Sequence, residues 1–314
     1  MSLESIVEKL EDHPLTNELI ERTQRNERLI LAGASRTAKA LITTSLAKKE
    51  SKQLLVIVPT LEDATRWLPL LKNCGWTKTC LYPTSEVSPY DSVQVTSEIV
   101  WGQLQVLSDI LELQNEENIA IIATERSLQP HLPPLEYLKS KCLKLKVGDS
   151  IDLGKLSAQL SECGYIKTSN IDQEGTWTRR GDILDIYPVS SELPIRLELF
   201  GDQLEKIKEF DPISQRSLDK IDNVCITPTG FDPLIIEQVL SDKEGYINSL
   251  LSEDEYEKLL NSKSLSSARK YLGVAFNKPS SLLNYLDKKT FIVVDERLQA
   301  KTHGNAWHKI ATES

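Results

Sequence analysis

Short apolar runs alternate with amphipathic stretches along the first part of the chain. Leu54–Val58 and Ile119–Ala123 each hold five consecutive apolar residues, the length and composition of a buried strand. Apolar side chains recur at helical spacing in residues 61–71 and 96–115, which are therefore predicted to be helices. Strands that alternate with helices are typical of a parallel sheet with crossover connections. The pattern predicts an α/β body that begins with residues 1–135.

Two further apolar runs extend this prediction. Arg28–Ala32 is predicted to be a buried strand that leads into a helix through the segment Gly33–Ala40. Phe291–Val294 is predicted to be another buried strand, and it follows an acidic helix predicted for Ile235–Leu260. Its apolar character indicates that the α/β body resumes in residues 229–314, so that the body is split in the sequence.

Residues 136–228 follow a different pattern, in which short β-prone runs are closely spaced. In Ile195–Phe200 apolar positions alternate with charged ones, as in a strand with one buried face. Gly-Asp pairs that begin at Gly181 and Gly201 are typical of tight hairpin turns. The predicted strands are Thr176–Arg180, Ile183–Tyr187, Ile195–Phe200 and Leu204–Phe210. We therefore predict an α+β domain with an antiparallel sheet, inserted into the α/β body.

Composition and charge limit the chemistry that the chain can carry. Its net charge of −9 argues against a protein that grips nucleic acid through bulk positive charge. The 5 cysteines are widely spaced and include no C-x-x-C pair, which indicates reduced thiols in a cytoplasmic protein and no structural zinc. Neither a membrane-spanning run nor a signal-peptide pattern is present. We expect no metal, no cofactor and no membrane partner.

The segment Gly33–Ala40 occupies the position of a phosphate-binding loop, between a predicted strand and a helix. The working pattern is G-x-x-x-x-G-K-[ST], and Gly33 and Lys39 match it. Ala38 stands where the second glycine belongs, and its β-carbon crowds a loop whose N–H groups must wrap around phosphate. Ala40 replaces the Ser or Thr and has no oxygen to offer Mg²⁺. The sequence therefore predicts a degenerate nucleotide loop in a P-loop-NTPase-like body.

An acidic pair, Asp295 and Glu296, follows the last predicted strand and resembles the pair that completes such a nucleotide site. Because two alanines interrupt the loop, we expect no ATP hydrolysis and no catalytic residue in this chain. Lys39 is expected to be a solvated lysine at the start of a helix. A protein-binding module, an active ATPase and a direct DNA binder are the competing classes of function at this point.

Three strings within and just around the predicted hairpins resemble a known domain. Residues 180–188 read Arg-Gly-Asp-Ile-Leu-Asp-Ile-Tyr-Pro, and residues 196–202 read Arg-Leu-Glu-Leu-Phe-Gly-Asp. Residues 210–217 read Phe-Asp-Pro-Ile-Ser-Gln-Arg-Ser. These strings resemble the small inserted domain that the excinuclease component UvrB shares with transcription-repair coupling factors. In both families this domain docks onto the excinuclease component UvrA, so the resemblance implies that residues 136–228 bind UvrA.

Other features distinguish these two families. UvrB keeps an intact phosphate-binding loop and a tyrosine-rich hairpin that clamps DNA, whereas Tyr82–Gln103 offers little aromatic content for stacking on bases. Pro59–Trp67 and Ser88–Asp91 also look like the coupling factors. The resemblance extends from Glu4 to Arg297, and the chain is similar to the N-terminal UvrB-like module of the coupling-factor family (Mfd).

This resemblance implies a role in nucleotide excision repair. Proteins of the family recruit the excinuclease component UvrA to RNA polymerase stalled at DNA damage, and an ATP-dependent DNA translocase displaces the polymerase. The domains that contact polymerase and DNA are expected to lie beyond residue 314. A fragment of UvrB and a DNA-binding ATPase domain are the alternatives.

The resemblance also implies docking residues. Arg180 matches the arginine of the family's Arg-Gly-x-x-x-Asp pattern, and Arg179, Trp177 and Lys167 are close to it in sequence. A guanidinium group suits this role because its planar fork pairs with a carboxylate through two hydrogen bonds. The alternative is that these arginines only pair with acidic side chains across the hairpins. The family often carries an arginine directly after a Gly-Tyr pair, but here Ile166 and then Lys167 follow that pair.

Overall fold

The computed structural model describes residues 2–25, 27–85, 95–112, 118–242, 245, 248–262, 265 and 268–313. The chain divides into two compact units. Unit 1 consists of Met1–Glu86, Leu113–Gln129 and Tyr285–Ser314, and unit 2 consists of Val87–Glu112 and Pro130–Asn284. Part of the segment Tyr82–Gln103, including the string Ser88–Asp91, lies outside the described residues.

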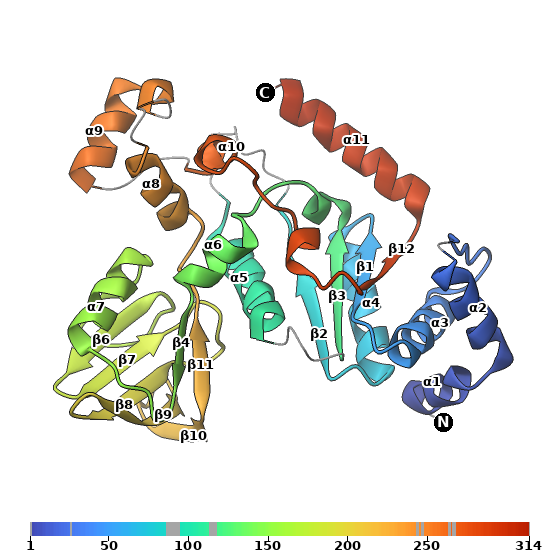
Figure 1. Ribbon diagram of the computed structural model, residues 1–314, viewed down its shortest axis with the longest axis horizontal. Helices are drawn as coiled ribbons and strands as arrows, with labels where there is room; N and C mark the ends of the chain where they lie inside the picture. Colours follow the sequence, from blue (N-terminus) through green and yellow to red (C-terminus); the bar gives the residue numbers. More distant parts are fainter. Residues whose placement is uncertain are drawn as a thin grey trace. The chain divides into compact units, whose positions relative to one another are not determined.

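The core of unit 1 is a four-stranded parallel sheet with the strand order β12-β1-β3-β2 (Figure 1). Its strands are β1 Leu54–Val58, β2 Lys78–Tyr82, β3 Ile119–Thr124 and β12 Phe291–Val294. Leu54 of β1 lies opposite Phe291 of β12, and Ile57 lies opposite Val294. The prediction that the late apolar run continues the α/β body is therefore confirmed for this strand. β1 and β3 are buried along their whole lengths because they occupy the middle of the sheet.

The helices of unit 1 are α1 Leu3–Glu11, α2 Pro14–Gln24, α3 Arg36–Lys49, α4 Leu61–Asn73, the 3-10 helix η1 Glu125–Leu128 and α11 Arg297–Glu313. Helices α1, α3 and α4 pack on one face of the sheet, where Ala40, Trp67 and Leu71 meet alternate residues of β1. Ser35 caps α3 and Thr60 caps α4 through side-chain hydrogen bonds to backbone N–H groups. Both caps lie near the carboxyl end of the sheet, where ion pairs join the two helix starts.

The segment predicted to be a strand at Arg28–Ala32 is not part of this sheet, so that prediction is wrong. β12 forms the edge of the sheet, and Ile30 is 85% exposed. An extended run becomes a strand only when it forms hydrogen bonds with a neighbour, and an apolar run does not reveal whether one is adjacent. Residues 28–40 therefore lack the strand–loop–helix arrangement of a phosphate-binding loop. The α/β class with a parallel sheet is confirmed, and a P-loop-NTPase-like body is not.

Unit 2 contains a six-stranded sheet with the order β10-β9-β8-β7-β6-β5. Its strands are β5 Ile166–Lys167, β6 Thr176–Arg180, β7 Ile183–Tyr187, β8 Ile195–Phe200, β9 Gln203–Phe210 and β10 Ser217–Ile221. Neighbours are antiparallel except for β5 and β6. Gly181 and Gly201 occupy the hairpin turns with φ values of 63° and 64°, a backbone conformation that is unfavourable for residues other than glycine. The four predicted strands and the separate antiparallel sheet are confirmed.

One face of this sheet packs on helix α7, Leu153–Glu162. Leu184, Ile186 and Leu197 belong to the same buried cluster as Leu156 of the helix. The residues between them along each strand lie on the opposite face, because successive side chains of a strand point to opposite sides. The alternation that predicted the strands therefore separates a buried face from a polar one.

A two-stranded antiparallel ribbon joins the ends of the segment that carries this sheet. Its strands are β4 Leu143–Lys146 and β11 Asn223–Ile226. Leu143 lies opposite Ile226, and Lys146 lies opposite Asn223. Leu145 and Ile226 are buried in the same cluster as α7, so the ribbon is packed onto the core of the domain.

The remaining helices are α5 Ser97–Glu112, α6 Leu135–Lys141, α8 Asp232–Leu240, η2 Asn248–Leu250, α9 Glu253–Ser262, η3 Ala268–Tyr271, α10 Leu272–Ala275 and η4 Leu282–Tyr285. The prediction of a single helix over Ile235–Leu260 is wrong, because α8 ends and α9 starts within that range. A capping box starts α9: the N–H of Glu255 donates to Ser252 Oγ at 3.3 Å, and the Glu255 carboxylate accepts from the Ser252 N–H at 3.1 Å. In the described parts of the chain, none of the helices has the length and apolar character needed to cross a membrane.

Candidate functional sites

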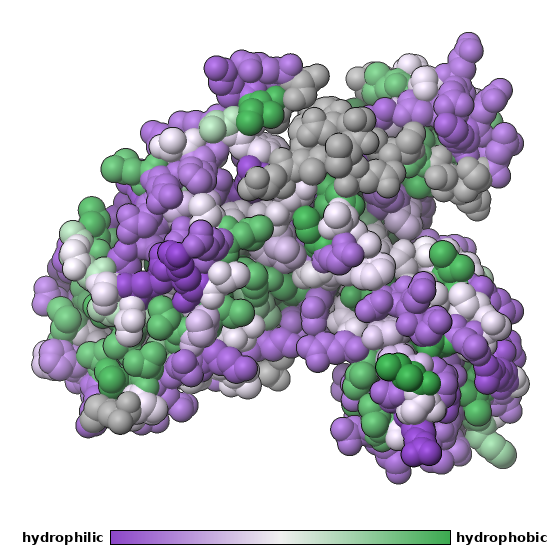
Figure 2. All heavy atoms as spheres, turned by 180° about the vertical axis from the view of Figure 1, so that it is seen from behind, coloured by the Kyte–Doolittle hydropathy of each residue, from purple (hydrophilic) through white to green (hydrophobic). Residues whose placement is uncertain are grey.

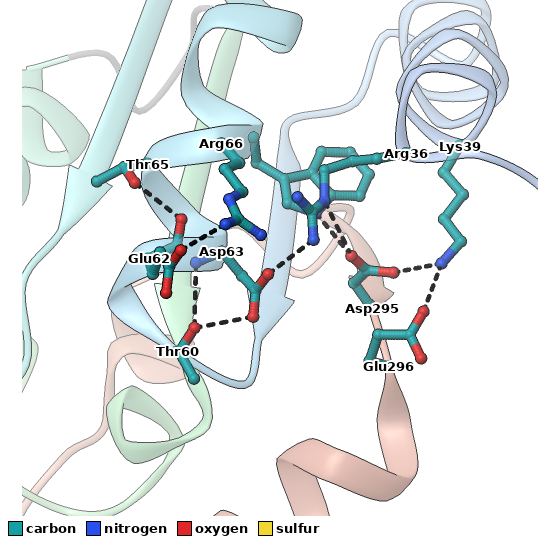
Figure 3. Close-up of polar contacts among 10 residues, drawn as sticks. Arg36, Lys39, Thr60, Glu62, Asp63, Thr65, Arg66, Asp295 and Glu296 are labelled. Atoms are coloured by element: carbon teal, nitrogen blue, oxygen red, sulfur yellow. Dashed lines mark hydrogen bonds and ion pairs between the residues drawn. The ribbon is translucent and has the colours of Figure 1, made fainter.

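The first site brings together the predicted nucleotide loop and the acidic pair that was expected to complete it. The ammonium group of Lys39, near the start of α3, lies 2.6 Å from Asp295 Oδ1 and 3.0 Å from Glu296 Oε1 (Figure 3). Both carboxylates follow the end of β12 directly. The Lys39 side chain is only 18% exposed and that of Asp295 is 2% exposed. The expectation that Lys39 is a solvated lysine is therefore wrong, because the fold places a buried carboxylate beside it.

Further donors surround Asp295. The indole N–H of Trp67 donates to Asp295 Oδ2 at 2.8 Å, and Arg36 Nε lies 3.7 Å from the same oxygen. Arg36 also binds Asp63 at 2.7 Å, so one guanidinium links α3, α4 and the end of β12 (Figure 3). Burial opposes ionisation of Asp295, but the hydrogen bonds from Lys39 and Trp67 and the nearby positive charges outweigh it and lower the pKa of that carboxyl.

This cluster suits a structural role better than nucleotide binding. A phosphate-binding lysine must present its charge to the ligand, whereas two carboxylates here neutralise Lys39. Burial opposes the charged form of Lys39, but its hydrogen bonds to Asp295 and Glu296 prevail and raise the pKa of the lysine. Ala40 is fully buried and carries no oxygen, and Gly33 has a φ of 70° in a loop that no strand precedes.

The described residues form neither a metal-binding site nor a reactive-thiol site. Among them, no group of three or more His, Cys, Asp or Glu side chains is arranged to hold a metal ion. Five cysteines are buried and form no disulfide with one another: Cys74, Cys80, Cys142, Cys163 and Cys225. Burial raises the pKa of the Cys163 thiol to about 11, so this side chain stays protonated at neutral pH.

The second site is the end of β6, where the predicted docking arginines lie. Both Arg179 and Arg180 are exposed, and they point to opposite faces of the strand. The Arg180 guanidinium donates to the carbonyl oxygen of Ser169 at 2.9 Å and lies 3.4 Å from Asn170 Oδ1. Arg179 Nε donates to the carbonyl oxygen of Gly181 at 3.0 Å. In the portion of the chain that the structure describes, neither arginine lies within ion-pair distance of a carboxylate, so neither forms the ion pair across the hairpins that was the alternative to docking.

Trp177 and Lys167 occupy a different environment from these arginines. Trp177 is only 4% exposed and belongs to the core beneath α7, and its buried indole N–H has no hydrogen-bond partner among the described residues. The Lys167 ammonium lies 5.3 Å from the centroid of the indole ring, an arrangement typical of a cation–π contact. Trp177 thus positions Lys167 and offers little surface of its own.

Sequence reasoning did not single out the residues that share a face with Arg180. Ile183 lies opposite Arg180 across β6 and β7 and is 40% exposed. One step further along the strands, Arg196 holds Asp185 through two hydrogen bonds of 2.7 and 2.9 Å. The Arg196 guanidinium also stacks over Phe210, 4.9 Å from the ring centroid. The alternation in residues 195–200 already indicated that this face is charged, but not which pairs form on it.

Comparison with known proteins found matches over the segment that contains the second site. Residues 143–230 match the model of the UvrB interaction domain family. The chain is 28% identical over 288 residues to the transcription-repair-coupling factor of Bacillus subtilis, a match that covers 85% of this chain and 24% of that protein. It is 27% identical over 296 residues to the factor of Haemophilus influenzae, covering 93% of this chain and 25% of that protein.

These matches confirm the resemblance found in the sequence strings. The chain spans about a quarter of the length of the relatives it matches. The chain is thus similar to the transcription-repair-coupling factors over most of its length, and its residues 143–230 match the UvrB interaction domain family.

Proposed function

We propose that this chain is the UvrA-binding module of a transcription-repair coupling factor. In this proposal, residues 136–228 recruit the excinuclease component UvrA to RNA polymerase stalled at DNA damage. Polymerase contact, DNA contact and ATP-driven translocation belong to other parts of a longer cytoplasmic protein. The match of residues 143–230 to the UvrB interaction domain supports the choice of partner, and the relatives named as coupling factors support the cellular process.

The observation that carries the proposal is the state of Arg180. Its guanidinium is exposed and held by the carbonyl oxygen of Ser169, a neutral acceptor, so its charge is not neutralised within the described part of the chain. Arginine is enriched among the residues that dominate interface energies because a planar fork binds carboxylates in two hydrogen bonds. The half-exposed Ile183 beside it adds apolar area to the same patch. An oriented guanidinium next to apolar surface suits an acidic, partly apolar docking partner.

The test is a titration of the 314-residue chain with purified UvrA by isothermal calorimetry. The wild type should bind, and Arg180→Ala should weaken binding by about 2 kcal/mol or more, the usual scale of a hot spot. Arg25→Ala is a matched control, because Arg25 is an exposed arginine of unit 1 whose carboxylate contact is 3.9 Å long. Equal affinities for both variants and the wild type would exclude Arg180 from the docking surface.

We also infer that the body of the chain is a degenerate form of the P-loop class. Lys39 at the start of a helix and Asp295 at the end of a parallel strand are placed together, as the lysine and acidic pair of a nucleotide site would be. In this chain they neutralise each other, so we propose that it neither binds nor hydrolyses ATP. The negative net charge of −9 likewise disfavours the alternative of a direct DNA binder.

A further inference from the structure

The turn Asp211–Arg216 joins β9 to β10 and is fixed by its own hydrogen bonds. The N–H of Asp211 donates to the Arg216 carbonyl at 2.9 Å, and the N–H of Gln215 donates to the Asp211 carbonyl at 2.8 Å. The Asp211 carboxylate accepts from the Ser214 N–H at 2.6 Å. Pro212 restricts the backbone further because its ring fixes φ. The turn therefore has one well-defined conformation before any partner arrives.

Gln215 anchors this turn to the domain. Its backbone has a φ of 58°, a left-handed conformation that is uncommon for residues other than glycine. Its side-chain amide donates to the Pro212 carbonyl at 2.7 Å and to the Ile171 carbonyl at 3.0 Å. Ile171 is 1% exposed and packs against Tyr187 and Phe210 of the sheet. The side chain of Gln215 thus ties the turn to a buried cluster.

This rigid turn presents an apolar side chain to solvent. Ile213, at its tip, is 92% exposed. Exposure alone does not identify a binding site, since hydrophobic residues form small scattered groups among hydrophilic ones on the face seen in Figure 2. The distinguishing feature of Ile213 is that its backbone is already ordered, so binding it costs less conformational entropy than binding a side chain on a mobile loop.

The turn is also connected to the predicted docking arginine. Arg180 donates to the Ser169 carbonyl, and Gln215 donates to the Ile171 carbonyl two residues later. One short segment therefore holds both Arg180 and the turn, and it fixes their relative position. We propose that Ile213 is a second anchor of the docking surface, which inserts into an apolar pocket of the partner that receives Arg180. This inference rests on the proposed function, with UvrA as that partner.

The experiment compares two identical substitutions at similarly exposed sites. Ile213→Ser is set against Ile30→Ser, because Ile30 is 85% exposed and lies in unit 1. Binding of each 314-residue variant to purified UvrA is measured by isothermal titration calorimetry, with Arg180→Ala in parallel. Ile213→Ser should weaken binding about tenfold or more, the effect of losing one buried aliphatic side chain. Ile30→Ser should stay within about twofold, and neither change should shift the thermal midpoint appreciably.

A second variant tests the role of the rigid turn. Gln215→Ala removes the two side-chain hydrogen bonds but leaves Ile213 in place, and it should weaken binding about threefold to tenfold. The inference alone fails if Arg180→Ala weakens binding while Ile213→Ser matches the wild type. It also fails if Ile213→Ser only alters self-association, seen by light scattering, and leaves the affinity for UvrA unchanged. If the wild type does not bind UvrA, the proposed function and this inference both fail.

Discussion

Lys39 and Asp295 are 256 positions apart in the chain, yet their side chains meet at 2.6 Å. This contact links two distant segments of unit 1, because it joins the start of α3 to the end of the edge strand β12. If Lys39 were a nucleotide-binding lysine without its ligand, its buried ammonium group would have no negative partner. A lysine that neutralises a carboxylate with 2% exposure keeps a buried charge from being left unpaired.

Replacing Lys39 should therefore destabilise the protein. Lys39→Met leaves the Asp295 carboxylate with Trp67 and the more distant Arg36, and we expect a loss of about 2–4 kcal/mol in the free energy of unfolding. Urea denaturation followed by circular dichroism measures it. Lys72→Met, at an exposed position of α4, is the control and should change stability by less than about 0.5 kcal/mol. Similar small effects of both substitutions would show that the buried ion pair contributes nothing.

Nucleotide should not bind at the loop. Titration with ATP and Mg²⁺ should give no heat above dilution, because Lys39 is neutralised and Ala40 offers no metal ligand. The double variant Ala38→Gly, Ala40→Thr should not hydrolyse ATP either, because no strand precedes the loop to position it. Phosphate release that exceeds the buffer rate and disappears in Lys39→Ala would refute this.

The stability of unit 2 should depend on pH through Glu255. Burial opposes its ionisation, but hydrogen bonds from Lys270 and Ser252 outweigh burial and lower the pKa of the carboxyl to about 2. A lowered folded-state pKa contributes stability that is complete above the ordinary value of 4.5 and is lost as the pH falls towards 2. Glu255→Gln should cost about 1–3 kcal/mol between about pH 5 and 8 and nothing near about pH 2.

Unfolding free energies of wild type and Glu255→Gln across this pH range provide the measurement. Glu257→Gln, at an exposed position of the same helix, is the control and should follow the wild type at every pH. A difference between wild type and Glu255→Gln that stays constant down to about pH 2 would contradict the assignment.

Two glycines with similar backbones separate conformational strain from steric overlap. Gly148 and Gly164 have φ values of 98° and 91°, and a side chain at either position is strained. A Cβ at Gly148 would meet no atom within 4 Å, so Gly148→Ala should cost about 1–2 kcal/mol. A Cβ at Gly164 would overlap the Thr229 hydroxyl and lie 3.0 Å from Pro233, which should add about 1–3 kcal/mol. Chemical denaturation of both variants measures the difference, and equal losses would exclude the overlap.

The apolar patterns predicted correctly those strands whose burial in a sheet is visible in the sequence itself. The antiparallel strands of unit 2 bury every second residue, and the buried strands of unit 1 form its sheet, so their sequences contain the signal. Arg28–Ala32 has an apolar composition but pairs with no strand among the described residues, and composition does not encode that absence. The start of α9 could have been predicted, because Ser252 and Glu255 have the spacing of a capping box.

The sites could be predicted in part. The motif placed Lys39 and Asp295 in one site, but only the fold shows that they neutralise each other. The burial of Trp177 could have been inferred, because it lies opposite the apolar Ile186 across β6 and β7. The hydrogen bonds that orient Arg180 come from a loop eleven residues earlier, and no local pattern signals them.

The β4–β11 ribbon places Leu143 beside Ile226, so the segment between them leaves and re-enters its host at one point. A stretch of chain with adjoining ends can be spliced into a surface loop of another protein without pulling the recipient's own backbone apart. A single insertion can therefore transfer the whole segment with its fold intact. This geometry makes residues 143–226 a natural cassette for grafting onto an unrelated carrier.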